Sequence, residues 1–271
     1  MNHYPTLDVK SIVLYQSPHF EFFIDFYFDK TTAVFAFIGT VLTFLVVIFS
    51  RYYMHREEGF KRFFTTLLAF FVGYNLIVFS GNFESLFIGW EILGITSFLL
   101  IAFYRDRYLP VKNGFKVLSF YRLGDICLIL AMWMSHHLWH KNITFMEWNQ
   151  VEQVLYVFRA HHFQAIFISV MIVIAATIKS AQLPFSTWLP RAMEGPTTSS
   201  AIFYGSLSVH IGVFLLLRTY TFWANEWIIK GMVIAVGLLS SVIATLIARV
   251  QPTVKTQIAY SSIAQIGLIF I

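Results

Sequence analysis

Residues 178–200 read IKSAQLPFSTWLPRAMEGPTTSS and follow a long apolar run. The segment contains Pro184, Pro190 and Pro196, which cannot all lie inside one regular helix because each removes a hydrogen-bond donor and clashes with the preceding turn. A discontinuous helix is tolerated at membrane depth only where its freed backbone groups face protein or a water-filled cavity. We therefore expect a helix break inside a membrane, with Lys179 directly before it.

The composition is that of a membrane protein. Of the 271 residues, 58% are hydrophobic and 12% are charged, whereas about 25% are charged in an ordinary soluble domain. The 19 Lys and Arg exceed the 14 Asp and Glu, and in such a chain this excess indicates membrane topology rather than nucleic-acid binding. The single cysteine, Cys127, excludes an internal disulfide. We predict an all-α, polytopic membrane helical bundle whose surroundings are the lipid bilayer.

A helix needs about 20 mostly apolar residues to cross the hydrocarbon layer. This criterion predicts spans near residues 31–50, 63–80, 83–104, 117–139, 163–181, 197–217, 228–248 and 254–271. Residues 1–30 have no long apolar core, so we expect an extracytoplasmic N-terminal segment rather than a signal peptide. The last apolar stretch ends without polar capping residues. We expect residues 31–271 to be the transmembrane domain and an incomplete piece of a longer chain.

The positive charges indicate the orientation of the predicted helices. If the loops at 51–62 and 105–116 are cytoplasmic, the cytoplasmic side carries Arg51, Arg56, Lys61, Arg62, Arg105, Arg107, Lys112, Lys116, Arg191, Arg249 and Lys255. The other side carries only Lys10, Lys30, Lys141, Arg159, Arg218 and Lys230. Cytoplasmic loops of membrane proteins are enriched in Lys and Arg. We therefore place the N-terminus outside the cytoplasm of a multi-pass protein in a bacterial inner membrane.

Five ionisable residues lie well inside the predicted spans: Glu91, Arg122, Asp125, Lys179 and His210. A charge at the bilayer centre costs about 2.5–3.5 kcal/mol on insertion scales, so such residues are partnered and often belong to an ion route. The alternative for each is a structural pair that holds helices together. Five such residues in one small bundle favour a role in ion transport over a purely structural role.

Glu91 and Lys179 are the strongest candidates for an ion route. Burial disfavours the charged form of each group, whereas an opposite charge within about 4–6 Å favours it. Two such groups at close distance can hold or release a proton together. The pair therefore predicts a proton switch.

Arg122 and Asp125 are three residues apart and so share one helical face. They lie nearer the basic loop than the middle of their predicted span. We interpret them as a structural or modulating ion pair rather than as direct proton carriers.

A helix over 197–217 would place Ser199, Ser206 and His210 on one face, at spacings of seven and four residues. A buried histidine is more often satisfied by its neighbours than part of a relay, but the serines beside this one suggest a hydrated proton path. We include all three as candidate proton-translocation residues.

His136 and His140 have the spacing of a helical metal pair, but no acidic or cysteine ligand accompanies them at a motif distance. We interpret these histidines as an interfacial cluster and predict no metal site and no cofactor. No phosphate loop or nucleophile elbow is present, so we expect no catalytic residue and a chain that is not an enzyme by itself.

Four stretches together resemble the proton-conducting, antiporter-like membrane subunits, the group that contains NADH dehydrogenase subunit 5 (subunit L) and the related MrpA protein of Mrp antiporters. They are LFIGWEILGITSFLLIAFYRDR, YRLGD, KSAQLPFSTWLPRAMEGPT and IAYSSIAQIG, in the family's order. The resemblance implies that Glu91 and Lys179 are the carboxylate and lysine of the first half-channel, beside a discontinuous helix. It also implies a second, inverted half, which this sequence does not complete.

One helix departs from the respiratory pattern. Where respiratory subunits resemble PVSALIHAATMVTAG, this chain has TSSAIFYGSLSVHIG, so Tyr204 stands in place of a histidine and His210 follows six residues later. Tyrosine does not titrate near neutral pH as histidine does. This version is most similar to DabB, the membrane subunit of DAB inorganic-carbon transporters, whose partner is DabA, a soluble zinc protein similar to carbonic anhydrase.

The sequence leads to two functional hypotheses. The first is a subunit that conducts protons or sodium and couples the gradient to CO2 or bicarbonate accumulation with a DabA-like zinc protein. The second is a proton-pumping subunit of a respiratory NADH:quinone oxidoreductase translocase or of an Mrp-type sodium/proton antiporter. Both predict other subunits as partners. A purely structural scaffold is the third alternative.

Overall fold

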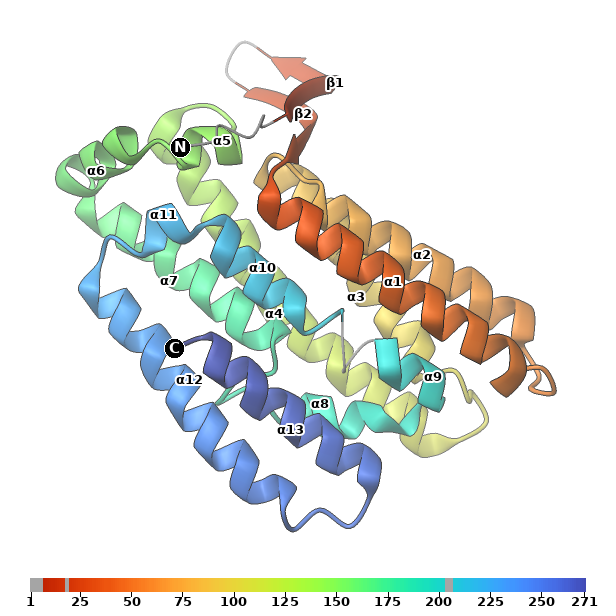
Figure 1. The fold of residues 1–271 in the computed structure, drawn as a ribbon. Coiled ribbons are helices and arrows are strands. Elements are labelled where there is room, and N and C mark those ends of the chain that lie inside the picture. Colours follow the sequence, from red (N-terminus) through yellow and green to blue (C-terminus); the bar gives the residue numbers. More distant parts are fainter. Residues whose placement is uncertain (1–6, 18–19, 203–206) are drawn as a thin grey trace.

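The computed structural model describes residues 7–17, 20–202 and 207–271 of the chain. Its long helices are α1 (Lys30–Tyr53), α2 (Phe60–Val78), α3 (Phe83–Ile101), α4 (Tyr108–Trp139), α7 (His162–Lys179), α12 (Trp227–Ala248) and α13 (Val254–Ile269). Shorter helices are α5 (Phe145–Trp148), α6 (Val151–Ala160), α8 (Trp188–Arg191), η1 (Ala192–Glu194), α9 (Thr197–Ser200), α10 (His210–Arg218) and α11 (Tyr220–Trp223). The long helices lie side by side as a bundle (Figure 1).

Six of the helices in the described ranges are long and apolar enough to cross a membrane: α1, α2, α3, α4, α7 and α12. The predicted all-α membrane bundle is therefore confirmed. The loops that join α1 to α2 and α3 to α4 lie at one end of the bundle, whereas α5 and α6 lie at the other (Figure 1). The two loops carry arginines from the predicted basic side, so the helix arrangement agrees with the predicted charge asymmetry.

An antiparallel hairpin, which the apolar pattern does not predict, precedes the first helix. Strand β1 (Leu7–Ser17) pairs with β2 (Phe20–Phe28). Phe23, Asp25 and Tyr27 alternate as buried residues along β2, which is the two-residue period of a strand with one buried face. The backbone amide of Tyr27 donates to the carbonyl of Phe79 at 2.9 Å. This bond fixes the hairpin to the end of α2.

The predicted discontinuous helix is present. Helix α7 ends at Lys179, and the next helical segments, α8 and η1, start only at Trp188. Ala181 has a positive φ of 53° in the intervening turn, a region that L-residues rarely adopt. Pro184 lies in this turn, Pro190 lies inside α8, and Pro196 precedes α9. The break therefore divides this segment into a long first half, α7, and a short second half, α8 with η1.

The expectation of one helix over 197–217 is wrong. Residues 207–209 form a turn, and α10 begins at His210. The backbone amide of Leu207 donates to the carbonyl of Ile202 at 3.0 Å, five residues earlier, which is not the α-helical spacing. Ser180 of the α7 break donates its hydroxyl to the Val209 carbonyl at 2.8 Å. The first interruption is thus bonded to the second.

Helices α2 and α3 approach each other at two glycines. A Cβ atom on Gly89 would lie 2.7 Å from the Gly73 carbonyl oxygen and 2.8 Å from the Ile77 amide nitrogen. Both neighbours are backbone atoms, which cannot move aside as a flexible side chain can. This contact sets the position of α3, and α3 carries Trp90 and Glu91 of the candidate site.

We predict that Gly89→Ala destabilises the protein by about 1–3 kcal/mol, because an extra methyl group overpacks the contact between α2 and α3. Gly231→Ala in α12 is the matched control, since a Cβ there meets nothing within 4 Å and Ala favours helix by about 1 kcal/mol over Gly. Thermal unfolding in detergent should give a lower midpoint for the first variant only. Equal midpoints would contradict this account of the helix contact.

Candidate functional site

The candidate site is centred on Lys179, at the last residue of α7. The residue is 1% exposed. Its Nζ lies 4.0 Å from the ring centroid of Tyr121 on α4 and 4.6 Å from that of Trp90 on α3. Within the described ranges, Nζ has no hydrogen-bond partner. The ammonium group is therefore held by aromatic faces, which attract a cation through their negative quadrupole.

A network of charges lies beside this lysine. The Arg122 guanidinium contacts Glu91 at 2.6 Å through Nη2 and Asp125 at 2.9 Å through Nε. Trp90 Nε1 donates to Asp125 Oδ1 at 2.9 Å. The Trp90 side chain thus connects the two parts of the site, because its nitrogen binds Asp125 while its ring faces Lys179.

Burial increases along this network. The side chain of Arg122 is 45% exposed and that of Glu91 is 23% exposed, whereas that of Asp125 is 5% exposed. Lys179 is the most buried member. A charged side chain in the middle of a spanning helix is costly in hydrocarbon, so it faces protein or water in the membrane. The network therefore leads from the side of the isolated chain into its interior.

Glu91 and Lys179 are not in direct contact. Within the described chain, Glu91 pairs with Arg122, whereas Asp125 accepts a hydrogen bond from Trp90, whose ring faces Lys179. Helix α4 also packs against α7 beside the lysine, where Gly124 faces the Ile178 side chain. The Arg122–Asp125 pair expected from spacing is present and belongs to the same site as Glu91.

The expected serine path is arranged differently. Ser199 lies in α9 and donates its hydroxyl to the carbonyl of Pro196 at 2.7 Å, which is a bond within the first turn of this helix. His210 is the first residue of α10. Ser206 and Tyr204 lie outside the described residues. Tyr121 and Ser208 hydroxyls, 3.4 Å apart, lead from Lys179 towards the start of α10.

Trp90, Tyr121 and Ser208 were not among the predicted site residues. Each is of a type that is common in helix interiors, and no spacing rule distinguishes them from packing residues. Trp90 directly precedes Glu91 in the sequence, and this adjacency was the only available signal.

The backbone groups freed at the break have partners. Gln182 Nε2 donates to the carbonyls of Ser180 at 3.0 Å and of Ile263, on α13, at 3.2 Å. The amide of Leu183 donates to Ser240 Oγ, on α12, at 2.9 Å. The indole of Trp188 donates to the Ile178 carbonyl at 3.0 Å. The break is thus a fixed structure whose polar groups face protein.

The histidines near the other end of the bundle are separate from this site. His137 stacks on Trp133 with a centroid distance of 6.0 Å. His162 Nδ1 lies 3.3 Å from Glu226 Oε1. No group of three or more possible metal ligands is found among the described residues.

The comparisons with known proteins agree on one family. Residues 80–271 match the family described as NADH:quinone oxidoreductase/Mrp antiporter, TM. Residues 15–64 match the family described as NADH-Ubiquinone oxidoreductase (complex I), chain 5 N-terminus. The first match contains α3, α4 and α7, and therefore the whole candidate site.

Curated relatives include NADH-ubiquinone oxidoreductase chain 5 of two vertebrates. The protein from Petromyzon marinus is 34% identical over 253 residues, which cover 93% of this chain and 41% of the relative. The protein from Sus scrofa is 32% identical over 254 residues, which cover 93% of this chain and 40% of the relative. The chain therefore spans about two fifths of the length of these relatives.

Two solved structures are also similar. The Mrp complex from Dietzia sp. DQ12-45-1b contains a chain with a TM-score of 0.86 and 25% identity, covering 97% of this chain and 28% of that chain. The archaeal membrane-bound sulfane sulfur reductase shares the fold, with a TM-score of 0.80 and 21% identity over 92% of this chain and 50% of that chain. By its sequence match over residues 80–271, the chain belongs to the NADH:quinone oxidoreductase/Mrp antiporter family of membrane proteins.

Proposed function

We propose that this chain is the proton-conducting, or sodium-conducting, part of an antiporter-like membrane subunit, and that Lys179 is its central ionisable group. The observation that carries the proposal is the environment of Nζ. It is buried at a helix break without a hydrogen-bond partner among the described residues, between two aromatic rings and beside two carboxylates. Burial disfavours the charged form of such an ammonium, whereas neighbouring carboxylates favour it.

The charges suggest how the site works. With Glu91 and Asp125 ionised and both Arg122 and Lys179 protonated, the cluster is neutral. Arg122 keeps its charge at any physiological pH, so loss of a proton from Lys179 leaves one net negative charge. That charge attracts the next proton, and the interacting groups titrate as a unit. The charges of Asp125 and Glu91 thereby control how easily Lys179 releases its proton.

The next step of the proposed path leads across the break. Tyr121 and Ser208 lie between Lys179 and the beginning of α10, where His210 could accept a proton. Imidazole changes its charge near neutral pH, which suits it to a relay. Ser199 and Ser206 remain candidates for lining this path. We propose no cofactor and no catalytic residue in this chain.

We further propose that the chain works with other membrane subunits. The Arg122 side chain is 45% exposed in the isolated chain and lies within a spanning helix. Protein or water has to cover such a group in a membrane. The similar solved chains come from multisubunit assemblies, an Mrp complex and an archaeal respiratory membrane complex, which supports this assembly.

We predict that Lys179→Met lowers coupled proton transport at least about tenfold, because methionine fills a similar volume but cannot carry a proton. The measurement is proton uptake into proteoliposomes that contain the complete complex. Lys230→Met is the matched control, since Lys230 is exposed at the start of α12. Normal transport by the Lys179 variant would favour the scaffold alternative.

We predict that Trp90→Phe and Asp125→Asn each lower transport by about ten- to 150-fold, which corresponds to the loss of a hydrogen bond to a charged group, about 1.5–3 kcal/mol. Phenylalanine keeps an aromatic face towards Lys179 but removes the donor to Asp125. Transport should be measured from pH 6 to 9, because altered positioning of Asp125 shifts the pH profile, whereas a loss of packing lowers transport equally at every pH. An unchanged profile in both variants would remove Asp125 from the mechanism.

A second candidate function is coupling of the ion gradient to CO2 or bicarbonate accumulation with a DabA-like zinc protein. The sequence TSSAIFYGSLSVHIG favours it, because Tyr204 stands at the position where the respiratory pattern has a histidine. The respiratory relay then cannot be copied residue for residue, and His210 would replace part of it.

Growth of cells that lack carbonic anhydrase distinguishes the two functions. The full-length gene, expressed together with its chromosomal neighbour, should restore growth in air if the second function is correct. Lys179→Met in the same pair is the control, because it retains the partner protein. If the intact pair does not restore growth, although the protein is in the membrane and the proton gradient is normal, the inorganic-carbon function is excluded.

A further inference from the structure

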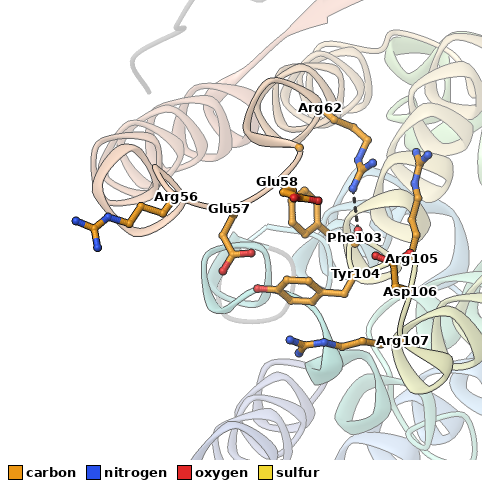
Figure 2. A pocket seen from close by; sticks show the side chains of 10 residues that line it. Arg56, Glu57, Glu58, Arg62, Phe103, Tyr104, Arg105, Asp106 and Arg107 are labelled. Atoms are coloured by element: carbon orange, nitrogen blue, oxygen red, sulfur yellow. Dashed lines mark hydrogen bonds between the residues drawn. The ribbon is translucent and has the colours of Figure 1, made fainter.

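A charged pocket of about 570 Å³ lies at the basic end of the bundle, away from the candidate site. It is formed by the loop between α1 and α2 and by the loop between α3 and α4 (Figure 2). The residues that line it are Arg56, Glu57, Glu58, Gly59, Arg62, Phe103, Tyr104, Arg105, Asp106 and Arg107. Because both loops join spanning helices, the pocket opens at the boundary between membrane and water.

The floor of the pocket is fixed. Arg62 Nη2 donates to the carbonyl of Phe103 at 2.9 Å, and its guanidinium lies 5.0 Å from the Phe103 ring centroid. Phe103 is 3% exposed. Arg62, on α2, thus binds the loop between α3 and α4. The charges that remain for a ligand are on the other residues of the pocket.

Both loops contribute acidic and basic side chains. The first loop carries Arg56, Glu57 and Glu58, and the second carries Arg105, Asp106 and Arg107. Within the described chain Glu57, Glu58 and Arg107 form no ion pair, although they line one pocket. The two glutamates and Arg107 therefore do not neutralise each other directly.

Tyr104 lies between Glu57 and Arg107. Figure 2 shows Glu57 directed towards the Tyr104 hydroxyl, with Arg107 along the other side of the ring. The Arg107 guanidinium is 4.5 Å from the ring centroid. Burial raises the pKa of the Tyr104 phenol, the Glu57 carboxylate raises it further, and Arg107 partly opposes this. Both charges therefore act on one ring, and a small group next to it would be within reach of both.

We propose that this pocket binds the headgroup of a phospholipid with a primary ammonium, such as phosphatidylethanolamine. Arg107 would bind its phosphate, because guanidinium matches phosphate geometry with two parallel hydrogen bonds. Glu57 and Glu58 would accept hydrogen bonds from its ammonium. Exposed aromatic side chains at the same end, Tyr52 and Tyr108, mark the level of lipid headgroups.

The charge pattern distinguishes this lipid from the other common ones. Phosphatidylglycerol carries the phosphate but no cation for the two glutamates. Phosphatidylcholine carries a cation without N–H donors, so it cannot hydrogen-bond to a carboxylate. Basic pockets between spanning helices bind anionic headgroups, and the glutamates make this pocket different from those.

The test is retention of lipid by the full chain in its complex, measured by native mass spectrometry. The detergent-solubilised protein is mixed with equal amounts of the ethanolamine, choline and glycerol lipids with identical acyl chains. We expect the ethanolamine lipid to be retained about tenfold over the other two, which corresponds to one hydrogen-bonded charge. Retention of the glycerol lipid over the ethanolamine lipid, or equal retention of ethanolamine and choline lipids, would overturn the proposal.

Variants test separately which residues bind the ammonium and which bind the phosphate of the headgroup. Glu57→Gln with Glu58→Gln should abolish the preference for ethanolamine over choline, whereas Arg107→Gln should lower retention of all three lipids. Glu194→Gln and Arg51→Gln are the matched controls, since both residues are exposed at the same end and do not line the pocket. An equal effect of the controls would show that only overall charge matters. Displacement of bound lipid by equimolar free phosphoethanolamine would show that the pocket binds a soluble ligand rather than a lipid, and would overturn the proposal.

Discussion

The structure depends on a buried ammonium group at the end of an interrupted helix. Lys179 is 1% exposed, and its Nζ has no hydrogen-bond partner in the part of the chain that the structure describes. Burying an isolated charge is costly unless nearby groups compensate for it. Two aromatic rings and the carboxylates of α3 and α4 provide this compensation. The position of three helices is therefore tied to one cation.

The helix break holds this cation in place. Ser180 donates to the turn before α10, and Gln182 and Leu183 are bonded to α13 and α12. Each of these bonds uses a polar group at the interruption, and each reaches a different helix. Because buried backbone groups require partners, the interruption connects the second part of the bundle to the Lys179 site. A change of protonation at Lys179 would act on a junction of four helices.

Sequence patterns predicted the bundle, the helix break and the Arg122–Asp125 ion pair. Helical spans follow from apolar length, and the break follows from the three prolines, because both are local properties of the chain. The i, i+3 spacing predicted the Arg122–Asp125 pair, which is also local. The N-terminal hairpin was missed although Phe23, Asp25 and Tyr27 alternate along β2. The helix predicted over 197–217 was wrong because its apolar composition gives no sign of the turn at 207–209.

The order of residues along the chain is enough to identify which groups are ionisable within the membrane and where the helix must break, since proline chemistry and the cost of buried charge act at each position separately. Which of these charges meet depends on the packed bundle. Glu91 pairs with Arg122, and Asp125 is bonded to Trp90, whose ring faces Lys179. These contacts depend on how α4 packs on α3 and α7. Helix packing is a property of facing surfaces, and the spacing of residues along one chain does not contain it.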